Sequence, residues 1–487
     1  MFQTWDYSDE LATEVEGQRR VPLIITRSGT VFASFLPKVA TLLKSNVFDI
    51  APLLRKAIQV ESDDQEDLDD PMDDLDEPAA APMDDSWLDE LDEPRPPPPP
   101  PKRIRMDEVI ASGRKPPSFA HIKRRNRRNK KIAEQGQLPR PATLREHIHQ
   151  ERVIATECDA ATLPAAHGGY SAKVGDTWGS KKPRSLQDLL GLGFELIKWD
   201  GFESRPIVDV HGRIIAALVG QPRSADYAAA AARVFEAIES ERKATTYKPA
   251  AAHHRRGDFF ALNAGLSYGK GQRVPSRLDN GVHAALLARL LGNADVKRLA
   301  TFASAAFALW APNVYNYYKK CDTALHGHLP HLQRNFEKSI FSCATFNFGP
   351  DVWTFKHRDV LNLPFGMCAV QALGPFDPTK GGHLVLWELK LVIEFPPGAL
   401  ILIPSATMTH SNVPVQAGDQ RASFTQYTAG GIFRYVDNGF RTEAELAVQD
   451  PDGYARICAE KGTRWAMGLG LLSRVEDLLE DVHGASN

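Results

Sequence analysis

Cysteine is scarce in this sequence of 487 residues: there are five, an odd number, and no two form a Cys-x-x-Cys pair. This argues against a disulfide framework and against a cysteine-ligated zinc site, and it favours a reducing compartment. The most apolar run, residues 299–311, ends at Pro312, well short of the ~20 residues that cross a bilayer. The first ten residues lack the basic stretch and apolar run of a secretion signal. We therefore expect no membrane partner.

The sequence also has little net charge, because two segments of opposite sign nearly cancel. Residues 61–93 hold 17 acidic side chains and no Lys or Arg, whereas residues 102–131 hold 12 basic and 2 acidic ones. The acidic segment continues into a proline run, and this composition predicts a disordered linker over residues 61–101. The basic segment, residues 102–140, contains the cluster 123–131. That cluster favours a nuclear-import signal, and hence a nuclear location, or an arm that contacts phosphates; the alternative is a solvated run that pairs with the acidic block.

The remaining chain divides by its patterning. Residues 1–60 show no chemical motif and stay unassigned. Residues 141–254 form a predicted supporting region, with a hairpin at 206–219 and an alanine-rich helix that Asp226 caps and that runs to about Arg242. From Ser339 onward strand-length segments separated by turns predict a sandwich or jelly roll; they are 340–348, 366–372, 383–387, 389–395, 399–403 and 421–427. Residues 443–487 return to helical patterning. The fold class expected is α+β.

His357 and Asp359 lie two positions apart, a spacing that on a strand projects both side chains from one face. The pattern alone carries little weight. Fifteen histidines and 61 acidic residues in 487 positions give about two such matches by chance, and the sequence holds two. The other, His149 with Glu151, lies in a charged helical segment, where positions two apart diverge by ~200° around the axis. We interpret it as a chance match.

Three further residues place the first match in a chemical context. His410 follows the apolar strand 399–403, so a second imidazole reaches the same sheet region. Two histidines and one carboxylate leave adjacent positions open on an octahedral iron, which suits non-haem Fe(II) that binds a co-substrate and dioxygen. Arg421 and Ser423 again share a strand face. A guanidinium grips a carboxylate through two hydrogen bonds, as the distal carboxylate of 2-oxoglutarate requires.

With these residues, the chain from about 255 to 442 resembles the fungal TET/JBP-like 2-oxoglutarate, Fe(II)-dependent dioxygenases, the ten-eleven-translocation type of nucleic-acid base oxidase. The resemblance lies in five segments, which are residues 357–365, 377–387, 395–398, 410–415 and 421–427. It implies a dioxygenase domain over 255–442 with a double-stranded β-helix core. It also implies iron ligands at His357, Asp359 and His410, and 2-oxoglutarate held by Arg421 with Ser423.

Substrate contacts are predicted from polar residues near this domain. Asn347 is two positions from Thr345 on one strand, where its amide could reach the co-substrate or a base edge, although a structural hydrogen bond fits equally. Arg255, Arg256 and Lys270 belong to a basic, glycine-rich stretch whose cations could hold phosphates while a base is turned into the pocket; an ordinary surface loop is the alternative.

Other aromatic and histidine residues have simpler interpretations. His383 could line the pocket, but we expect it to support its strand. His326, His328 and His331 lack an acidic or thiolate ligand at a suitable spacing for a second metal site. A core-facing helix explains Tyr315, Tyr317 and Tyr318 better than base stacking does.

The sequence thus predicts an Fe(II)/2-oxoglutarate-dependent dioxygenase that uses dioxygen to oxidise a methyl group of a nucleic-acid base. The expected substrate is DNA that carries 5-methylcytosine or N6-methyladenine. Two alternatives stay open. The same barrel serves hydroxylases of protein side chains such as proline or lysine, and a binding module could keep the barrel without turnover. The basic residues at 123–131 and 255–256 favour nucleic acid over protein.

Overall fold

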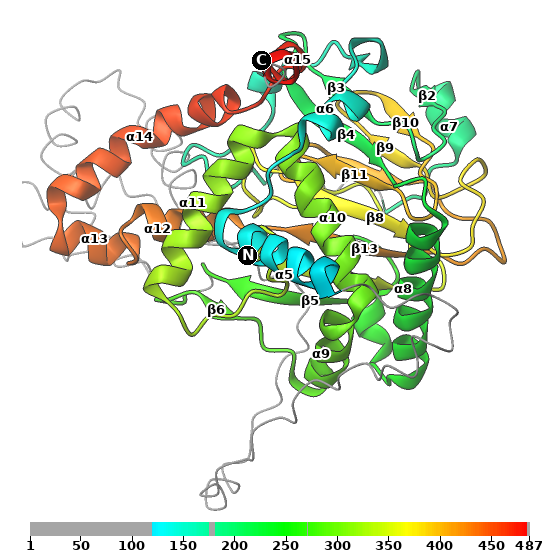
Figure 1. Cartoon of the computed structure of the whole chain (residues 1–487), viewed down its shortest axis with the longest axis horizontal. Coiled ribbons are helices and arrows are strands. Elements are labelled where there is room, and N and C mark those ends of the chain that lie inside the picture. Colours follow the sequence, from blue (N-terminus) through cyan, green and yellow to red (C-terminus); the bar gives the residue numbers. More distant parts are fainter. Residues whose placement is uncertain (1–118, 175–180, 270, 485–487) are drawn as a thin grey trace, which may run out of the picture. The chain divides into compact units, whose positions relative to one another are not determined.

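The computed structural model describes residues 119–174, 181–269 and 271–484 (Figure 1). The predictions for residues 1–60, for the linker 61–101 and for residues 102–118 of the basic segment lie outside these ranges. The predicted substrate contact of Lys270 also lies outside them. The described ranges cover the predicted supporting region, the predicted dioxygenase domain and most of the C-terminal tail.

The larger of two β-sheets has nine strands in the order β1-β3-β4-β11-β8-β13-β7-β5-β6. Every neighbouring pair is antiparallel except β1 with β3. The predicted hairpin is confirmed: β3 and β4 pair around the turn at Gly212, and β4 continues the sheet onto β11. In chain order the strands are β1 Ile154–Ala155, β3 Arg205–Val208, β4 Ile214–Gly220, β5 Phe260–Ser267, β6 Ser276–Arg277, β7 Cys343–Phe348, β8 Cys368–Leu373, β11 Leu400–Ile403 and β13 Ala422–Tyr427.

The smaller sheet has four strands in the order β12-β9-β10-β2. They are β2 Glu195–Ile197, β9 Leu384–Leu386, β10 Leu391–Ile393 and β12 His410–Asn412. β2 comes from the predicted supporting region and pairs in parallel with β10. The supporting region therefore adds strands to both sheets.

A shared apolar core lies between the two sheets. Ile215, Ile401 and Ile403 of the larger sheet join Leu386 and Ile393 of the smaller one in a single buried cluster. Successive residues of a strand point to opposite faces, so the alternate residues Leu400 and Leu402 face the other way, into a second cluster with the helices. The structure confirms the α+β class and the predicted strand-rich region from 339 onward.

Helices cover the outer face of the larger sheet (Figure 1). α10 and α11 pack there with Leu400 and Leu402, while α8, α9 and the first part of α10 pack against Phe346, Phe348 and Phe424. The helices are α5 Phe119–Gln135, α6 Pro141–His147, α7 Leu186–Gly191, α8 Ala225–Ala244, α9 Ala284–Gly292, α10 Ala294–Trp310, α11 Pro312–His328, α12 Gly430–Asp437, α13 Glu443–Gln449, α14 Pro451–Gly470 and α15 Val475–Gly484. Short 3-10 turns are η4 Gln150–Arg152, η5 Ala160–Thr162, η6 Pro249–Ala252 and η7 Gly281–His283.

The start of the alanine-rich helix differs from the prediction. Ser224 is the N-cap of α8, and its side chain accepts a hydrogen bond from the Tyr227 backbone N–H. Asp226 lies inside the first turn of α8, where its negative charge interacts favourably with the helix dipole, but it is not the N-cap residue. Within the described ranges, no helix combines the length and apolar character that a membrane span requires.

Candidate active site

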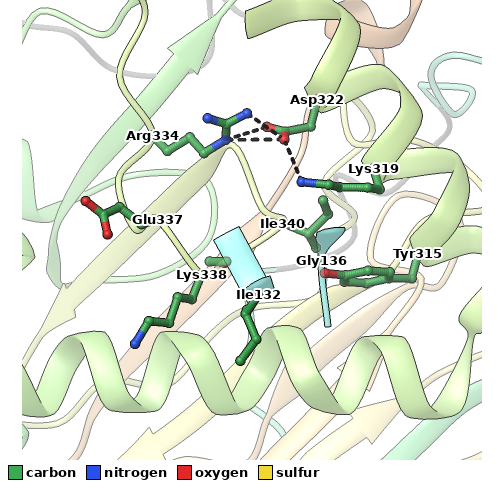
Figure 2. A pocket seen from close by; sticks show the side chains of 10 residues that line it. Ile132, Gly136, Tyr315, Lys319, Asp322, Arg334, Glu337, Lys338 and Ile340 are labelled. Carbon is green, nitrogen blue, oxygen red and sulfur yellow. Dashed lines mark hydrogen bonds and ion pairs between the residues drawn. The ribbon is translucent and has the colours of Figure 1, made fainter. Parts of the chain in front are cut away.

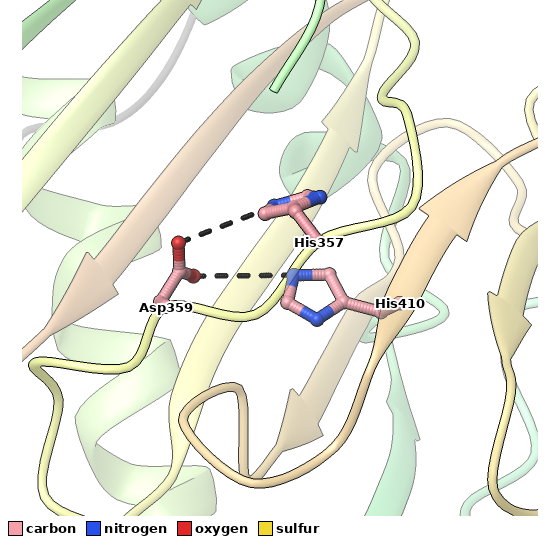
Figure 3. Close-up of side chains that lie close together, drawn as sticks. All are labelled: His357, Asp359 and His410. Carbon is pink, nitrogen blue, oxygen red and sulfur yellow. Dashed lines mark ion pairs between the residues drawn. The ribbon is translucent and has the colours of Figure 1, made fainter. Parts of the chain in front are cut away.

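His357, Asp359 and His410 converge in the structure, as predicted (Figure 3). One potential ligand atom from each lies within 4.8 Å of the other two, and no other such group of three occurs among the described residues. The Asp359 carboxylate lies 4.0 Å from Nε2 of His357 and 3.9 Å from Nε2 of His410. We refer to these three residues as the triad.

The backbone brings the two histidines together. The N–H of His357 donates to the carbonyl of His410 (3.0 Å), and the N–H of His410 donates back to the carbonyl of His357 (2.9 Å). This reciprocal pair is an isolated antiparallel bridge, so the expected strand around His357 and Asp359 is wrong: His357 bridges singly, and Asp359 lies in the following loop. A hydrogen bond from its N–H to the carbonyl of Ser405 (2.9 Å) holds Asp359 there.

Both imidazoles have a fixed orientation and tautomer. Nδ1 of His357 lies 2.7 Å from the carbonyl oxygen of Phe355, and Nδ1 of His410 lies 3.0 Å from that of Met408. A carbonyl oxygen can only accept, so each Nδ1 carries a proton, and Nε2 is the nitrogen of each ring that is left to bind a metal. A backbone carbonyl that holds the second nitrogen in this way is the usual support of a metal-ligating histidine. Nε2 of each ring is the nitrogen that lies near the Asp359 carboxylate.

Charge in the triad suits a divalent cation. Burial lowers the pKa of His357 well below its ordinary value, and the neighbouring His410 lowers it further, so His357 stays neutral. Burial acts to raise the pKa of Asp359, but His357, His410 and two arginines outweigh it and bring that pKa to about 2. The three side chains therefore offer two imidazole nitrogens and one carboxylate, a donor set that fits Fe(II).

Arg421 is a buried cation that has no carboxylate partner in the described part of the chain. Its side chain is 1% exposed; Nη1 donates to the carbonyl of Val352 (2.7 Å), and Nε has no hydrogen-bond partner. Among the described residues no acidic side chain forms an ion pair with it, and its nearest aromatic neighbours are Phe376 and Phe395. Burial therefore lowers the pKa of Arg421 to about 10. A buried guanidinium left in this state fits an acidic ligand such as 2-oxoglutarate.

Ser423 and Asn347 lie side by side on neighbouring strands. They are register partners between β13 and β7, and the Asn347 side-chain N–H donates to the Ser423 hydroxyl (2.8 Å). Ser423 lies two positions from Arg421, and the intervening Ala422 packs on the helix side of the sheet. Oδ1 of Asn347 is buried and has no partner. Asn347 therefore makes the structural hydrogen bond that was one of its two predicted roles. Its Oδ1 is still able to accept a hydrogen bond from a ligand.

Gly382 sets the position of the Arg421 side chain. Its backbone has φ of +73°, and a Cβ added there would lie 2.9 Å from the Phe376 ring and 3.3 Å from Cδ and Nε of Arg421. No sequence pattern predicts this contact, because Gly382 and Arg421 are far apart in the chain. A glycine here keeps the guanidinium free to adopt its buried position.

We expect Gly382→Ala to weaken 2-oxoglutarate binding by roughly tenfold or more, because the added methyl displaces Arg421, while Fe(II) binding to the triad is unchanged. The KM for 2-oxoglutarate and equilibrium binding of Fe(II) measure the two effects. Gly212→Ala is the matched control: Gly212 has the same φ of +73° but nothing within 4 Å of its added Cβ. It imposes the same backbone strain of roughly 1–2 kcal/mol without a clash. Equal effects of both substitutions would contradict the role of Gly382.

Of the predicted phosphate-binding residues, Arg255 and Arg256 lie near the triad. Nη1 of Arg255 donates to the carbonyl of Arg358 (3.1 Å), between the two ligands of the His-x-Asp motif. Both arginines contribute to the lowered pKa values of His357 and Asp359. They therefore add positive charge at the site, where an anionic ligand or a phosphate would be attracted.

His383 is fully buried but lacks the hydrogen bonds expected of a residue that supports its strand. It is 0% exposed, and neither ring nitrogen has a hydrogen-bond partner. Burial lowers its pKa to about 4. It follows Gly382 directly, so it lies beside the residue that contacts Arg421.

We expect the metal-free protein to lose stability as the pH falls from 6.5 toward 4, partly through His383. The unfolded state takes up a proton below the ordinary pKa of 6.5, whereas folded His383 resists it until about pH 4. The stabilisation is complete above pH 6.5, and its loss reaches on the order of 3 kcal/mol at pH 4. Urea unfolding across this range should show a smaller pH slope for His383→Gln than for wild type. The exposed-residue control His331→Gln should keep the wild-type slope; unchanged slopes in both variants would contradict the expectation.

The histidines and tyrosines of α11, and His149, have structural contacts. His326 contacts Asp322, and His328 stacks on Phe440; neither belongs to a metal-ligand group. Tyr318 is buried and packs on Phe433, which confirms the core-facing helix. His149, whose Nδ1 lies 3.5 Å from a carboxylate oxygen of Glu151, precedes a 3-10 turn and does not lie on the expected helix.

No family model matches the sequence, and no curated protein matches it. Solved structures do. One is the TET protein NgTET1 in complex with 5mC DNA, with 13% identity over 50% of this chain and 90% of that chain at a TM-score of 0.36. Another is a 2OG-Fe(II) oxygenase family protein from Burkholderia pseudomallei, with 18% identity over 42% and 92% of the two chains at a TM-score of 0.25.

A third is the viral collagen prolyl hydroxylase of Paramecium Bursaria Chlorella virus-1 in complex with 2OG. It has 16% identity over 18% of this chain and 58% of that chain, at a TM-score of 0.15. The structures to which the chain is similar thus include 2-oxoglutarate, Fe(II)-dependent oxygenases and a TET protein, and His357, Asp359 and His410 form a ligand set of the kind that such an iron requires.

Proposed function

We propose that the protein is an Fe(II)/2-oxoglutarate-dependent dioxygenase with a double-stranded β-helix core, and that it oxidises the methyl group of a modified base in DNA. The base is 5-methylcytosine or N6-methyladenine. The observation that carries the enzyme class is the convergence of His357, Asp359 and His410 in the same domain as Arg421, a buried cation that has no carboxylate partner among the described residues. One group supplies the ligands of a divalent metal, and the other supplies a cation for a dicarboxylate.

Each residue has a defined part in this function. Nε2 of His357, Nε2 of His410 and one oxygen of Asp359 would hold Fe(II), with both imidazoles kept in orientation by backbone carbonyls. The guanidinium of Arg421 and the hydroxyl of Ser423 would hold the distal carboxylate of 2-oxoglutarate. Bound Fe(II), 2-oxoglutarate and dioxygen supply the oxidation of a methyl C–H bond, with succinate and carbon dioxide as the other products. Burial of His357 and His410 limits the access of water to the reacting atoms.

DNA is favoured as substrate by positive charge and by the sequence resemblance. Arg255 and Arg256 place two guanidinium groups near the triad. Such groups bind the phosphates of a nucleic-acid substrate. A base must leave the helical stack to reach such a buried site. The same charge offers no advantage for a prolyl or lysyl side chain, which is the alternative substrate class.

Nucleoside mass spectrometry tests the proposal. The protein is reconstituted with Fe(II) without oxygen, then incubated with air, 2-oxoglutarate and duplexes that carry each methylated base, or with peptides that contain proline and lysine. We expect hydroxymethylated or demethylated nucleosides and an equal yield of succinate with one of the duplexes. Oxidation of a peptide alone would support the alternative, and no succinate above background with any substrate would overturn the enzyme class.

A nuclear location remains a prediction that follows from the same basic cluster, residues 123–131, whose cations are exposed on α5. Imaging of the full chain in cells, with and without substitution of this cluster, tests it.

A further inference from the structure

Helix α5 carries an unusual excess of positive charge. Its 17 residues include seven Lys and Arg side chains and a single acidic one, Glu134. Lys130 pairs with Glu134 across one helical turn, and both are exposed. The other six cations form no ion pair with a described carboxylate. They are Lys123, Arg124, Arg125, Arg127, Arg128 and Lys131, and all six are exposed.

The helix is nevertheless docked on the folded body. Its apolar side holds Ile132, and the chain ends the helix at Gly136, whose added Cβ would lie 3.1 Å from the Tyr315 hydroxyl of α11. The next backbone N–H, that of Gln137, donates to the same hydroxyl (2.8 Å), and the Gln137 side chain donates to the carbonyl of Lys338. The cations of α5 therefore lie on a helix that is fixed to α11 and to the segment around Lys338.

A pocket between α5 and α11 is not itself the binding place for an anion. Figure 2 shows Asp322 at its upper edge, with dashed lines to Arg334 and Lys319. The Asp322 carboxylate lies 2.8 Å from the Arg334 guanidinium and 4.0 Å from Lys319 Nζ. The pocket lining holds three cations against two carboxylates, whereas α5 holds seven cations against one, so most of the unbalanced charge lies on α5.

Four of the unpaired cations share one side of the helix. Arg124, Arg127, Arg128 and Lys131 follow the spacing i, i+3, i+4 and i+7, which places them within about one third of the helix circumference. We name these four residues the α5 stripe. Ile132 and Gly136 lie roughly 90° and 130° around the helix axis from the centre of the stripe, and all four stripe residues are exposed, so docking leaves the stripe facing solvent.

Lys338 adds a cation from another segment. Burial lowers the pKa of Lys338, and the proximity of Arg125 and Arg128 contributes in the same direction. The neighbouring Glu337 has the opposite effect on this pKa. Positive charge is thus gathered at this surface from two parts of the chain that are some 210 positions apart.

The α5 stripe is separate from the triad. α11, on which α5 is docked, packs in the cluster on the outer face of the larger sheet, whereas His410 begins a strand of the smaller sheet, across the inter-sheet core. Figure 1 shows α5 outside α10 and α11. A ligand of the stripe therefore contacts a different part of the protein from a base that enters the active site.

We propose that the α5 stripe binds the phosphate backbone of nucleic acid at a second site, on the opposite side of the larger sheet from the triad. The choice of polyanion rests on the proposed function. The stripe extends over about 10 Å at 1.5 Å per residue, and one DNA strand presents about three phosphates over that length. Three of its four members are arginines, whose planar fork matches phosphate oxygens. The site holds the protein on DNA without reading its sequence.

The test measures binding of the full chain to an unmethylated 30-base-pair duplex, without Fe(II), by fluorescence anisotropy at several salt concentrations. The stripe variant carries Arg124→Gln, Arg128→Gln and Lys131→Gln. The matched control carries Lys243→Gln, Lys297→Gln and Arg456→Gln, three other exposed cations without an ion pair among the described residues. Both variants lose the same charge, and none of the six residues belongs to the active site.

We expect the stripe variant to bind at least about tenfold more weakly at 0.1 M salt, with a slope of log K against log salt that is smaller by about 2 to 3. The control should keep at least most of the wild-type slope. Equal losses of affinity in both variants would show a general charge effect. Unchanged DNA binding by the stripe variant would mean that the α5 stripe binds something other than DNA, such as an import receptor or residues 61–93. Either result overturns the proposal.

The outcome is independent of catalysis. Turnover of a methylated trinucleotide, too short to reach both sites, should be the same for wild type and the stripe variant. If no nucleoside is oxidised but the stripe still governs DNA affinity, the proposed base oxidation fails and the binding site stands. If oxidation occurs and the stripe variant binds like wild type, only the second site fails.

Discussion

Asp359→Ala should abolish substrate oxidation, with a loss of at least about a thousandfold, and should greatly reduce Fe(II) affinity. The carboxylate is the one negative charge in the triad, and its pKa of about 2 keeps it ionised at any working pH. The two imidazoles that remain in the variant carry no negative charge and cannot balance a divalent cation. Loss of the metal removes several kcal/mol of transition-state stabilisation, and each 1.4 kcal/mol corresponds to a factor of ten in rate. Succinate yield and equilibrium dialysis with Fe(II) measure both effects.

A control separates loss of the metal from loss of the fold. Asp295→Ala removes a carboxylate that pairs with Arg233 (2.8 Å) at the start of α10, among the outer helices. An ion pair this exposed contributes at most about 1 kcal/mol, so activity should stay near wild type. DNA affinity in the absence of iron should be unchanged in Asp359→Ala. Normal succinate production by Asp359→Ala would refute the assignment of the triad.

Arg421→Met should raise the KM for 2-oxoglutarate by about a hundredfold or more and leave Fe(II) binding intact. Removal of one partner from a buried charge pair costs 2–5 kcal/mol, and the Arg421 guanidinium would be fully desolvated around the bound carboxylate. Arg421→Lys should also bind 2-oxoglutarate weakly, because an ammonium keeps the charge but not the planar fork. Steady-state kinetics with varied 2-oxoglutarate provide the measurement.

Thermal unfolding distinguishes this role from a structural one. In the ligand-free protein, Arg421 is a buried charge without a carboxylate partner among the described residues, and replacement of such a charge by an apolar side chain is often neutral or stabilising. The Tm of Arg421→Met without ligand should therefore equal or exceed that of wild type. Wild type should gain about 2.7 kcal/mol at 2-oxoglutarate concentrations of 100 times Kd, and the variant should gain little. A variant that unfolds at lower temperature but still responds to 2-oxoglutarate would contradict the co-substrate role.

The parts of this molecule that the sequence predicted are those set by local chemistry. Alternating and continuous apolar runs predicted six of the nine strands of the larger sheet and two of the four strands of the smaller one within a few residues, because strand periodicity is encoded locally. The triad was predictable because ligand types are restricted by the metal. The backbone bridge between His357 and His410 was not, because it joins residues 53 positions apart through main-chain groups that every residue carries.

Residues whose role depends on packing were the least predictable. The contact of Gly382 with Arg421 requires knowledge of which turn lies over which strand. The missing hydrogen-bond partners of His383 depend on the burial of its whole surroundings. The expected strand at Asp359 was wrong because the chain leaves the sheet after His357, and a two-residue spacing does not record where a strand ends.

The paired main chains of His357 and His410 bear on how the protein acquires its metal. Since each histidine is tied to the other through peptide groups, and each ring to a carbonyl of its own segment, two of three donor atoms are already in place in the apoprotein. Little conformational entropy then has to be given up when an ion enters. We therefore expect a bound iron to leave to a chelator and return without unfolding of the surrounding chain.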